Sequence, residues 1–402
     1  MGRGGTFATP HESVGIEVRA ICDSNEAKVK MWTEKLGSGV KGYTCYDEML
    51  AGDIDAVILC NYFDEHAPFA IKALKAGKHV MSECTCNATI AEGVALCRAV
   101  EESGKTYMLA ENYPYSRVGM ELRRIYQAGE LGDALYGDGE YNHPMDADTI
   151  NSIAPGRFHW RNTLPCTYYC THAYAPLMVA TDTMPVRVAA FSVAAKREIR
   201  KGTAVRGDTG AVIMCRMDNG AVFKMIGVSF PGHSGYYRIH GTRGAAEIER
   251  RTGQLHVWHD GWDIPEGGVS SRTYVPEWPE YRDLANKAGH GGGDFWTSFM
   301  FAKAIRENGQ PYLNVYRGVA MSSIGILAWK SALADGQPFD IPDFKDEAAR
   351  KLHENDTWNP ILKEGMDKAS ITPVSIAGYE PTEEDIANAT AMWEKTNYWR
   401  FG

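Results

Sequence analysis

Residues 54–82 read IDAVILCNYFDEHAPFAIKALKAGKHVMS, and this stretch decides the fold. Its first apolar run, residues 56–60, predicts a buried strand, and a helix is predicted from residue 67 to residue 76. Gly77-Lys78 ends that helix and leads into a second strand at residues 79–82. A strand, a helix and a second strand in this order are typical of a βαβ unit, whose two strands pair in parallel. The stretch therefore predicts an α/β domain with a parallel sheet.

The same alternation continues on both sides of this unit. A predicted strand at residues 16–22 ends at Asp23 and precedes a helix at residues 27–36. A predicted helix at residues 90–103 precedes a strand at residues 106–110. Repeated βα units of this kind favour a Rossmann-type sheet, so we predict a dinucleotide-binding domain at residues 1–112.

Beyond Asp133 the pattern changes, with an irregular stretch predicted at residues 142–165 and a hairpin at Asp218-Asn219-Gly220. Strands are predicted at residues 186–193, 211–217, 221–229 and 236–241, and helices at residues 295–308, 318–333 and 382–397. These runs favour an α+β domain at residues 113–402 with a large, mostly antiparallel open sheet. We expect residues 318–335 to pack back on the first domain and the last helix to serve an oligomer contact.

Length and charge narrow the function classes. The 402 residues are too many for one ordinary core, which agrees with two domains. The net charge of -9 argues against a nucleic-acid partner, since such a partner needs a concentrated basic face. Apolar runs stay short of the ~20 residues that cross a bilayer, so we predict no membrane partner.

Cysteine usage indicates a reducing compartment, and we predict a cytoplasmic protein. The nine cysteines are an odd number without a regular disulfide spacing. The Cys84-x-Cys86 and Cys166-x3-Cys170 pairs, even with His172 nearby, lack the paired spacing of a structural zinc site. We therefore predict no metal site.

The N-terminal residues predict part of a cofactor site. Gly2-Arg3-Gly4-Gly5 is similar to the tail of a G-x-G-x-x-G fingerprint, and Asp23 lies about 20 residues on, where such domains place the ribose-binding acid. The first strand and first glycines of that fingerprint are then expected upstream of Met1. We predict that Gly2, Arg3, Gly4 and Asp23 bind a dinucleotide, weakly or not at all if the natural chain starts at Met1.

Several blocks together resemble the Gfo/Idh/MocA oxidoreductases over nearly the whole chain. They are Ala20-Ile21-Cys22-Asp23, Asp55-Ala56-Val57-Ile58 leading to His66, residues 73–80, Glu83, Gly129-x-Leu131-Gly132 and Pro338-x-Asp340-Ile341-Pro342. Two departures stand out. Cys84 replaces the family's usual lysine, and Tyr168 stands where an aspartate usually precedes the histidine that His172 matches.

These departures make the chain similar to the NAD-dependent glycosidase branch, typified by α-N-acetylgalactosaminidases. Four motifs match that branch in order: Glu111-Asn112-x-x-Tyr115, Tyr141-Asn142-His143, Tyr169-Cys170-Thr171-His172 and His290-Gly291-Gly292-Gly293-Asp294. The resemblance implies a tightly bound, recycled NAD, and we expect NAD in this chain. It also implies that the sugar C3 hydroxyl is oxidised transiently, that the C1 substituent is eliminated, that water adds and that C3 is reduced again.

Such a route needs two proton-transfer groups on one face of the sugar, which a tyrosine and a histidine supply. We predict Tyr169 and His172, three residues apart, as the leading pair, and Tyr141 as a second group for the C2 proton. For cofactor binding the resemblance adds Asn61, His66, Glu83, Glu111 and Asn112. The predicted substrate-binding residues are Glu111, Tyr115, His143, Arg157, Trp160, His290 and Asp294.

Other functions stay open from the residues alone. A sugar or cyclitol dehydrogenase, or a 3-oxidase that releases the keto product, would use the same fold. A scaffold that does not use the cofactor is a third possibility. In every enzymatic reading the partner is a small sugar or glycoside, and the family's exposed sheet face implies a homo-oligomer.

Overall fold

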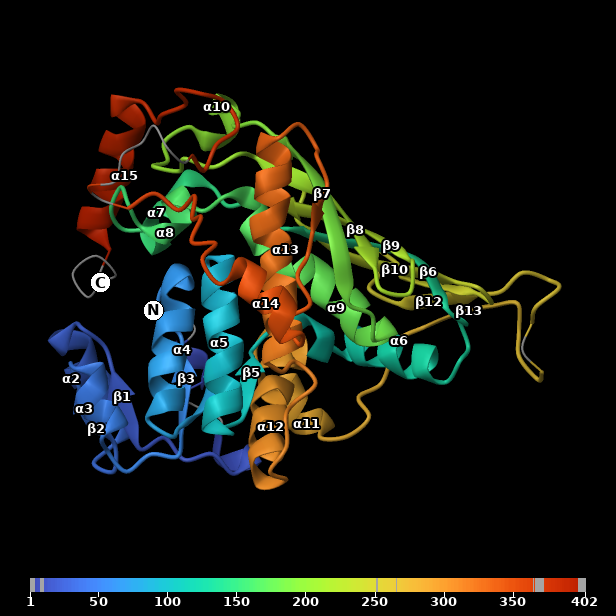
Figure 1. The fold of residues 1–402 in the computed structure, drawn as a ribbon, viewed down its shortest axis with the longest axis horizontal. Coiled ribbons are helices and arrows are strands. Elements are labelled where there is room, and N and C mark those ends of the chain that lie inside the picture. The colour runs from blue at the N-terminus through green and yellow to red at the C-terminus, as the bar shows by residue number, and fades with distance from the viewer. Residues whose placement is uncertain are drawn as a thin grey trace.

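A computed structural model describes residues 4–7, 11–250, 252–264, 266–363, 365 and 372–396. Gly2 and Arg3, two predicted cofactor residues, lie outside the described residues. Helices α4 and α5 stand beside short parallel strands on one side of the molecule, and a broad sheet spreads from the other side (Figure 1). The long helix α13 runs between these two parts.

The N-terminal part confirms the Rossmann-like parallel sheet. Strands β1 (Ala20–Cys22) and β2 (Lys41–Tyr43) pair in parallel, and β3 (Ala56–Leu59), β4 (His79–Ser82) and β5 (Tyr107–Leu109) form a second parallel sheet. Among the described residues no strand joins β1 to β3. The order of a Rossmann sheet places its first strand at that position.

Local signals account for the crossover helices. Helices α2 (Glu26–Leu36), α4 (His66–Lys75) and α5 (Ile90–Ser103) follow β1, β3 and β4. Thr89 and Glu92 form a capping box at the start of α5, which satisfies backbone N–H groups that the helix leaves unpaired. Gly104 ends α5 with a φ of 61°, a left-handed conformation that glycine adopts without steric cost.

The remaining strands form one nine-stranded sheet, in the order β13-β12-β11-β10-β6-β9-β8-β7-β14. Only β6 and β9 pair in parallel, so the prediction of a mostly antiparallel sheet is confirmed. The predicted hairpin joins β8 and β9 through residues 218–220. The strands are β6 (Ala134–Asn142), β7 (Pro185–Val193), β8 (Gly210–Met217), β9 (Val222–Val228), β10 (Ser234–Gly241), β11 (Ala245–Ile248), β12 (Leu255–Trp258), β13 (Ser271–Tyr274) and β14 (Phe339–Asp340).

One prediction for this region was wrong, and one strand was missed. Residues 142–165, predicted as irregular, contain α7 (Ala147–Ile153) and α8 (Trp160–Thr163). Strand β6, with the polar sequence ALYGDGEYN, was not predicted because its glycines and charged residues hide the usual alternation.

The remaining α-helices are α1 (Gly4–Phe7), α3 (Tyr46–Leu50), α6 (Arg117–Gln127), α9 (Thr171–Thr181), α10 (Arg197–Arg200), α11 (Arg282–Lys287), α12 (Gly293–Arg306), α13 (Val315–Leu333), α14 (Glu347–His353) and α15 (Glu383–Lys395). The 3-10 helices are η1 (His11–Val14), η2 (Phe63–Glu65), η3 (Tyr113–Tyr115), η4 (Cys166–Tyr169) and η5 (His290–Gly292).

Helix α13 contacts both parts of the molecule. It packs on β7 in the large sheet and on α5 and β5 in the parallel part. Ser322 on α13 accepts a hydrogen bond of 2.9 Å from the backbone N–H of Cys86, and Gly318 leaves room for the Cys86 thiol. Of the helices that the structure describes, none combines the length and apolarity needed to cross a membrane.

Glycine in β6 sets the distance between the large sheet and α9. A Cβ atom built on Gly139 would lie 1.9 Å from the carbonyl oxygen of Ala173 in the first turn of α9. Helix and strand therefore meet more closely than any side chain permits, and this contact places the start of α9 over β6.

Gly139→Ala is expected to lower the free energy of unfolding by about 1–3 kcal/mol, because α9 must move away from β6. Chemical denaturation measures this loss. Gly235→Ala on the neighbouring strand β10 is the matched control, since its Cβ would meet no atom within 4 Å. Equal stability of the two variants would contradict the close contact.

Candidate active site

A buried carboxylate and a histidine form the centre of the candidate site. Glu111 follows β5 and is fully buried, and His172 is the second residue of α9. The Nδ1 atom of His172 lies 2.8 Å and 2.9 Å from the two carboxylate oxygens of Glu111. Because an ionised carboxylate only accepts hydrogen bonds, Nδ1 of His172 carries a proton and donates it to Glu111.

Further donors hold the Glu111 carboxylate in place. The Cys84 thiol donates to Oε2 at 3.1 Å, and the backbone N–H of Tyr113 donates to Oε1 at 3.2 Å. Burial alone would raise the pKa of Glu111. The charge and hydrogen bond of His172, with hydrogen bonds from Cys84 and Thr171, outweigh burial and lower this pKa below its usual value. Glu111 is therefore an ionised group that orients His172.

Cys84 occupies the position of the family's lysine but supplies no positive charge. Burial, and then the negative charges of Glu111 and Glu83, raise the pKa of the Cys84 thiol well above its usual value. The protonated thiol is thus a hydrogen-bond donor to Glu111. The donor atoms of Cys84, Glu111 and His172 lie within 4.8 Å of one another, a spacing that a metal ion could use, and here hydrogen bonds join them. The expectation of no metal site stays a prediction.

Three tyrosine rings surround the His172 imidazole. Its ring centroid lies 4.6 Å from that of Tyr113, 4.7 Å from that of Tyr141 and 5.0 Å from that of Tyr169. The predicted residues Tyr141, Tyr169 and His172 therefore lie together, although they come from β6, η4 and α9. All three are partly exposed, so a ligand can reach them.

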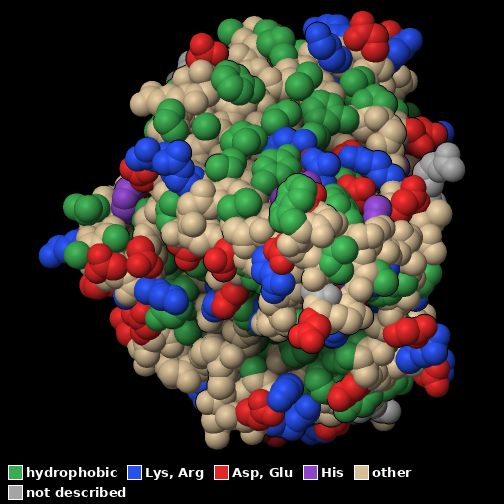
Figure 2. All heavy atoms as spheres, turned by 90° about the vertical axis from the view of Figure 1, so that its right-hand side faces the viewer, with side chains coloured by type: hydrophobic (Ala, Val, Ile, Leu, Met, Phe, Trp, Pro, Cys, Tyr) green, Lys and Arg blue, Asp and Glu red, His purple; other side chains and the backbone are tan. Residues whose placement is uncertain are grey.

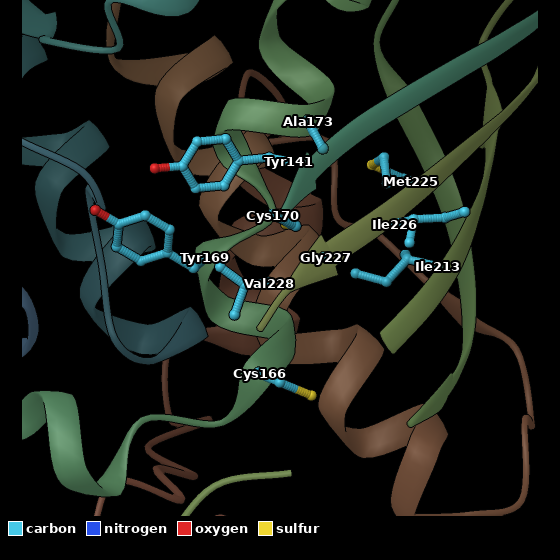
Figure 3. A pocket seen from close by; sticks show the side chains of 10 residues that line it. All are labelled: Tyr141, Cys166, Tyr169, Cys170, Ala173, Ile213, Met225, Ile226, Gly227 and Val228. Atoms are coloured by element: carbon cyan, nitrogen blue, oxygen red, sulfur yellow. The ribbon is translucent and has the colours of Figure 1, made fainter. Parts of the chain in front are cut away.

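The Tyr141 and Tyr169 hydroxyls point in the same direction, away from the strands of the large sheet (Figure 3). Behind the two rings lies an apolar cavity of about 10 Å³, lined by residues such as Ile213, Met225 and Val228. That volume is close to the space of one water molecule, so the cavity cannot hold a sugar. A substrate must approach these rings from the side of their hydroxyls.

The two phenols differ in acidity. Burial raises the pKa of Tyr169 to about 12, and the nearby Arg161 guanidinium opposes this rise. Burial raises the pKa of Tyr141 further, with added repulsion from Tyr169 and Tyr113. Tyr169 is therefore the more acidic phenol and the better proton-exchanging group of the two.

Several predicted cofactor residues follow the strands of the parallel sheets. Asp23 directly follows β1, accepts a hydrogen bond of 2.9 Å from the backbone N–H of Asn25 and keeps its carboxylate partly exposed. Gly4 lies beside Cys60 at the end of β3. The next residue, Asn61, has buried amide atoms without a hydrogen bond of good geometry among the described residues. A partly exposed carboxylate and an amide at these strand ends suit the ribose and amide groups of a dinucleotide.

The other predicted cofactor residues are structurally engaged. His66 begins α4, and its Nδ1 lies 3.0 Å from the carbonyl oxygen of Thr85. Burial lowers the pKa of His66 to about 4, so its imidazole is neutral near pH 7. Glu83 follows β4 and precedes Cys84. Asn112 donates a hydrogen bond of 3.0 Å to Asp294.

Asp294 joins the last sequence motif to the Glu111-Asn112 segment. His290 Nδ1 lies 2.8 Å from Oδ2 of Asp294, whose other oxygen accepts the hydrogen bond from Asn112. Gly293 is required here, since a Cβ atom would lie 2.5 Å from the carbonyl oxygen of Asn112. His290 and Asp294 were predicted to bind substrate, and the structure gives them a positioning contact with Asn112.

The remaining predicted substrate residues have different surroundings. His143 lies 5.9 Å from Tyr141 between ring centroids. Trp160 stacks on Phe63 at 5.1 Å, and Phe63 stacks on Tyr169 at 6.0 Å. Arg157 is exposed on the segment before α8. Tyr115 lines a separate pocket beside α6 and α12.

Sequence reasoning did not select three residues that contact this cluster. Tyr113 packs against His172, and its position inside the Glu111-Asn112-x-x-Tyr115 motif was the available signal. Tyr237 on β10 donates a hydrogen bond of 2.7 Å to the backbone oxygen of His172. His233 packs on the predicted residue His143, with 4.9 Å between the ring centroids. Nothing in the sequence placed Phe63 beside Tyr169.

Comparison with known families agrees with this geometry. Residues 3–111 match the oxidoreductase family with an NAD-binding Rossmann fold, Gfo/Idh/MocA. Residues 193–350 match the C-terminal domain of glycosyl hydrolase 109. The chain therefore matches a Gfo/Idh/MocA NAD-binding domain in its N-terminal part and a glycosyl hydrolase 109 C-terminal domain farther along. The recognition made from the sequence motifs is thereby confirmed.

Individual relatives extend the match over most of the chain. Glycosyl hydrolase family 109 protein 1 of Shewanella sp. (strain MR-4) is 24% identical over 367 residues, which cover 82% of this chain and 80% of that protein. An alpha-N-acetylgalactosaminidase of Shewanella oneidensis is 24% identical over 369 residues, with the same coverage. A solved levoglucosan dehydrogenase in complex with NADH and levoglucosan shares the fold, with a TM-score of 0.70 and 21% identity over 85% of this chain and 97% of that one.

Alkylation by iodoacetamide tests the state of Cys84, since the thiolate is the reactive form. We expect Cys84 to react at least about tenfold more slowly than the exposed Cys45 at pH 8, because each unit of raised pKa lowers the thiolate fraction about tenfold. Peptide mass spectrometry over a time course measures both rates. Equal rates would contradict a buried, protonated Cys84.

Proposed function

We propose that this chain is an NAD-dependent glycoside hydrolase that acts by transient oxidation of the sugar at C3. One observation carries the proposal: the Glu111–His172 pair lies against two tyrosines whose hydroxyls point to one side, and a cysteine replaces the dehydrogenase lysine. The histidine and the tyrosines are groups that can transfer protons at two adjacent carbons of the sugar. The glycosyl hydrolase 109 relatives support the same reading.

The cofactor would be held by the ends of the parallel strands. Asp23, Gly4 and Asn61 would bind its ribose and amide groups, with Glu83 and Asn112 nearer the sugar. Bound NAD would supply hydride acceptance at C3 and return the hydride at the end of the cycle. We further propose that it remains bound through turnover, since each cycle restores it.

His172 would act first. Its Nε2 lone pair would take the proton of the C3 hydroxyl while Glu111 stabilises the resulting imidazolium through Nδ1. The ionised state of Glu111, with a pKa below its usual value, is the state this role requires.

Tyr169 would handle the proton at C2: its hydroxyl would first release its own proton to solvent, and the phenolate would then accept the C2 proton. A ketone at C3 acidifies that proton, and its removal expels the C1 substituent by elimination; water then adds to the double bond at C1 and a proton returns to C2. Tyr169 suits this exchange better than Tyr141, since its phenol has the lower pKa. Tyr141 would donate its hydroxyl proton in a hydrogen bond to a sugar oxygen and so fix the ring.

A sugar dehydrogenase is the second candidate. The fold shared with levoglucosan dehydrogenase and with an aldose-aldose oxidoreductase from Caulobacter crescentus (TM-score 0.65, 17% identity, covering 81% of this chain and 92% of that one) favours it at the level of architecture. The absence of the lysine at Cys84 speaks against it, because a dehydrogenase of this family uses that amine. A noncatalytic scaffold would bind neither NAD nor a sugar.

The outer face of the large sheet supports a homo-oligomer. Phe191 on β7 is 60% exposed, and Val212 and Met214 on β8 are also exposed. Figure 2 shows hydrophobic side chains gathered over part of the face on this side of the molecule, among Lys and Arg residues. Pairing of two such faces would remove this apolar surface from water.

Asp23→Asn should weaken NAD⁺ binding about tenfold, because a charge-assisted hydrogen bond to the ribose is lost. Isothermal titration of the full chain measures the Kd. The control is Glu34→Gln, an exposed acid at the other end of α2. An unchanged Kd in Asp23→Asn would remove Asp23 from the cofactor site.

A panel of nitrophenyl glycosides, with and without added NAD⁺, tests the reaction. We expect nitrophenol release without net NADH, and a loss in kcat/KM of at least about a hundredfold in His172→Ala and in Tyr169→Phe. The control Tyr274→Phe, on the remote strand β13, should keep normal activity. Stoichiometric NADH without nitrophenol would identify a dehydrogenase instead.

A further inference from the structure

Three side chains of different chemistry meet at the buried carboxylate of Glu111. The Cys84 thiol lies 3.1 Å from Oε2, and His172 Nδ1 lies 2.8 Å and 2.9 Å from the two carboxylate oxygens. One sulfur, one oxygen and one nitrogen atom of this Cys-Glu-His cluster lie within 4.8 Å of one another. A thiolate, a carboxylate and an imidazole are the ligands by which proteins bind Zn²⁺.

The spacing of the cluster is close to that of a tetrahedral zinc site. With bonds of about 2.3 Å to sulfur and about 2.0–2.2 Å to nitrogen and oxygen, neighbouring ligand atoms are about 3.3–3.6 Å apart. The S–O and N–O distances of 3.1 Å, 2.8 Å and 2.9 Å would have to widen by only about half an ångström. Because Nδ1 already faces the carboxylate, an ion in place of its proton meets the nitrogen along its hydrogen-bonding direction.

The charge of the cluster also favours a divalent cation. Glu111 is fully buried and ionised, and the donors described above, a thiol, a backbone N–H and an imidazole, include no permanent positive charge. On binding, the Cys84 thiol would release its proton to solvent, and a neutral His172 would lose its proton from Nδ1 and take one up at Nε2. Thiolate and carboxylate would then balance the two charges of the ion, so the buried site would become neutral.

Regular elements hold the three ligands in place. Cys84 lies two residues after β4, Glu111 lies two residues after the neighbouring strand β5, and His172 is in the first turn of α9. The His172 side chain is 12% exposed, so the cluster reaches the surface through this ring. Ligands that are held in position before binding lose little conformational entropy when the ion arrives.

We propose that Cys84, Glu111 and His172 bind one Zn²⁺ ion reversibly, with a water molecule at the fourth tetrahedral position. A thiolate and an imidazole favour Zn²⁺ over Mg²⁺, which takes oxygen ligands. The sequence prediction of no metal site concerned cysteine pairs close together in the chain, whereas Cys84 and His172 lie 27 and 61 residues from Glu111. Binding is measured without a sugar, so it is tested separately from the proposed glycosidase reaction.

Titration of the metal-free full chain with Co²⁺, a spectroscopic substitute for Zn²⁺, tests this inference. We expect a near-ultraviolet charge-transfer band from the Cys84 thiolate that saturates at one equivalent of Co²⁺. One equivalent of Zn²⁺ should remove the band, and the same amount of Mg²⁺ should leave it unchanged. The absence of a thiolate band, or a band that Mg²⁺ removes as readily as Zn²⁺, overturns the proposal.

Two variants locate the site. Cys84→Ser removes the sulfur and should abolish the band, while His172→Ala keeps the thiol and should weaken Co²⁺ binding at least about tenfold. Cys45→Ser removes an exposed thiol and is the matched control, with an unchanged band. A band that persists in Cys84→Ser, or an unchanged affinity in His172→Ala, overturns the proposal, and thermal melts show that both variants are folded.

Discussion

The ionised carboxylate of Glu111, buried without access to water, is the constraint on which the rest of the site depends. A buried charge is costly unless donors surround it, and His172, Cys84, Thr171 and the backbone of Tyr113 supply them. These donors follow β4 and β5 or lie at the start of α9. The carboxylate therefore connects the part of the molecule with the parallel strands to the part with the large sheet.

Close backbone contacts between helices and their neighbours position the residues of the site. Gly139 lets α9 approach β6, which places His172 beside Tyr141, and Gly293 lets α12 approach Asn112. Helix α13 packs against both the parallel strands and the large sheet. Small residues at these contacts therefore act on the site without touching it.

Much of this arrangement could be predicted from the sequence. The βα units and the hairpin at residues 218–220 follow from periodicity and turn residues, and the grouping of Tyr141, Tyr169 and His172 is what the family resemblance implies. Strand β6 was not predicted because its polar sequence lacks the usual alternation of polar and apolar residues, and its glycine is needed for the contact with α9. Tyr237 and Phe63 were not predicted as site residues because their contacts join segments that are far apart in the chain. Such contacts leave no local pattern in the sequence. The boundary at residue 112 and the individual site roles stay predictions.

The central claim is that Tyr169 and the Glu111–His172 pair cleave a glycoside by moving protons at C2 and C3 of the sugar. Turnover in D₂O with a cleaved glycoside tests it most directly, with the product analysed by proton NMR. We expect deuterium at C2 of the released sugar, because the C2 proton leaves and returns from solvent in each cycle. Cleavage that leaves C2 fully protonated would contradict the elimination route.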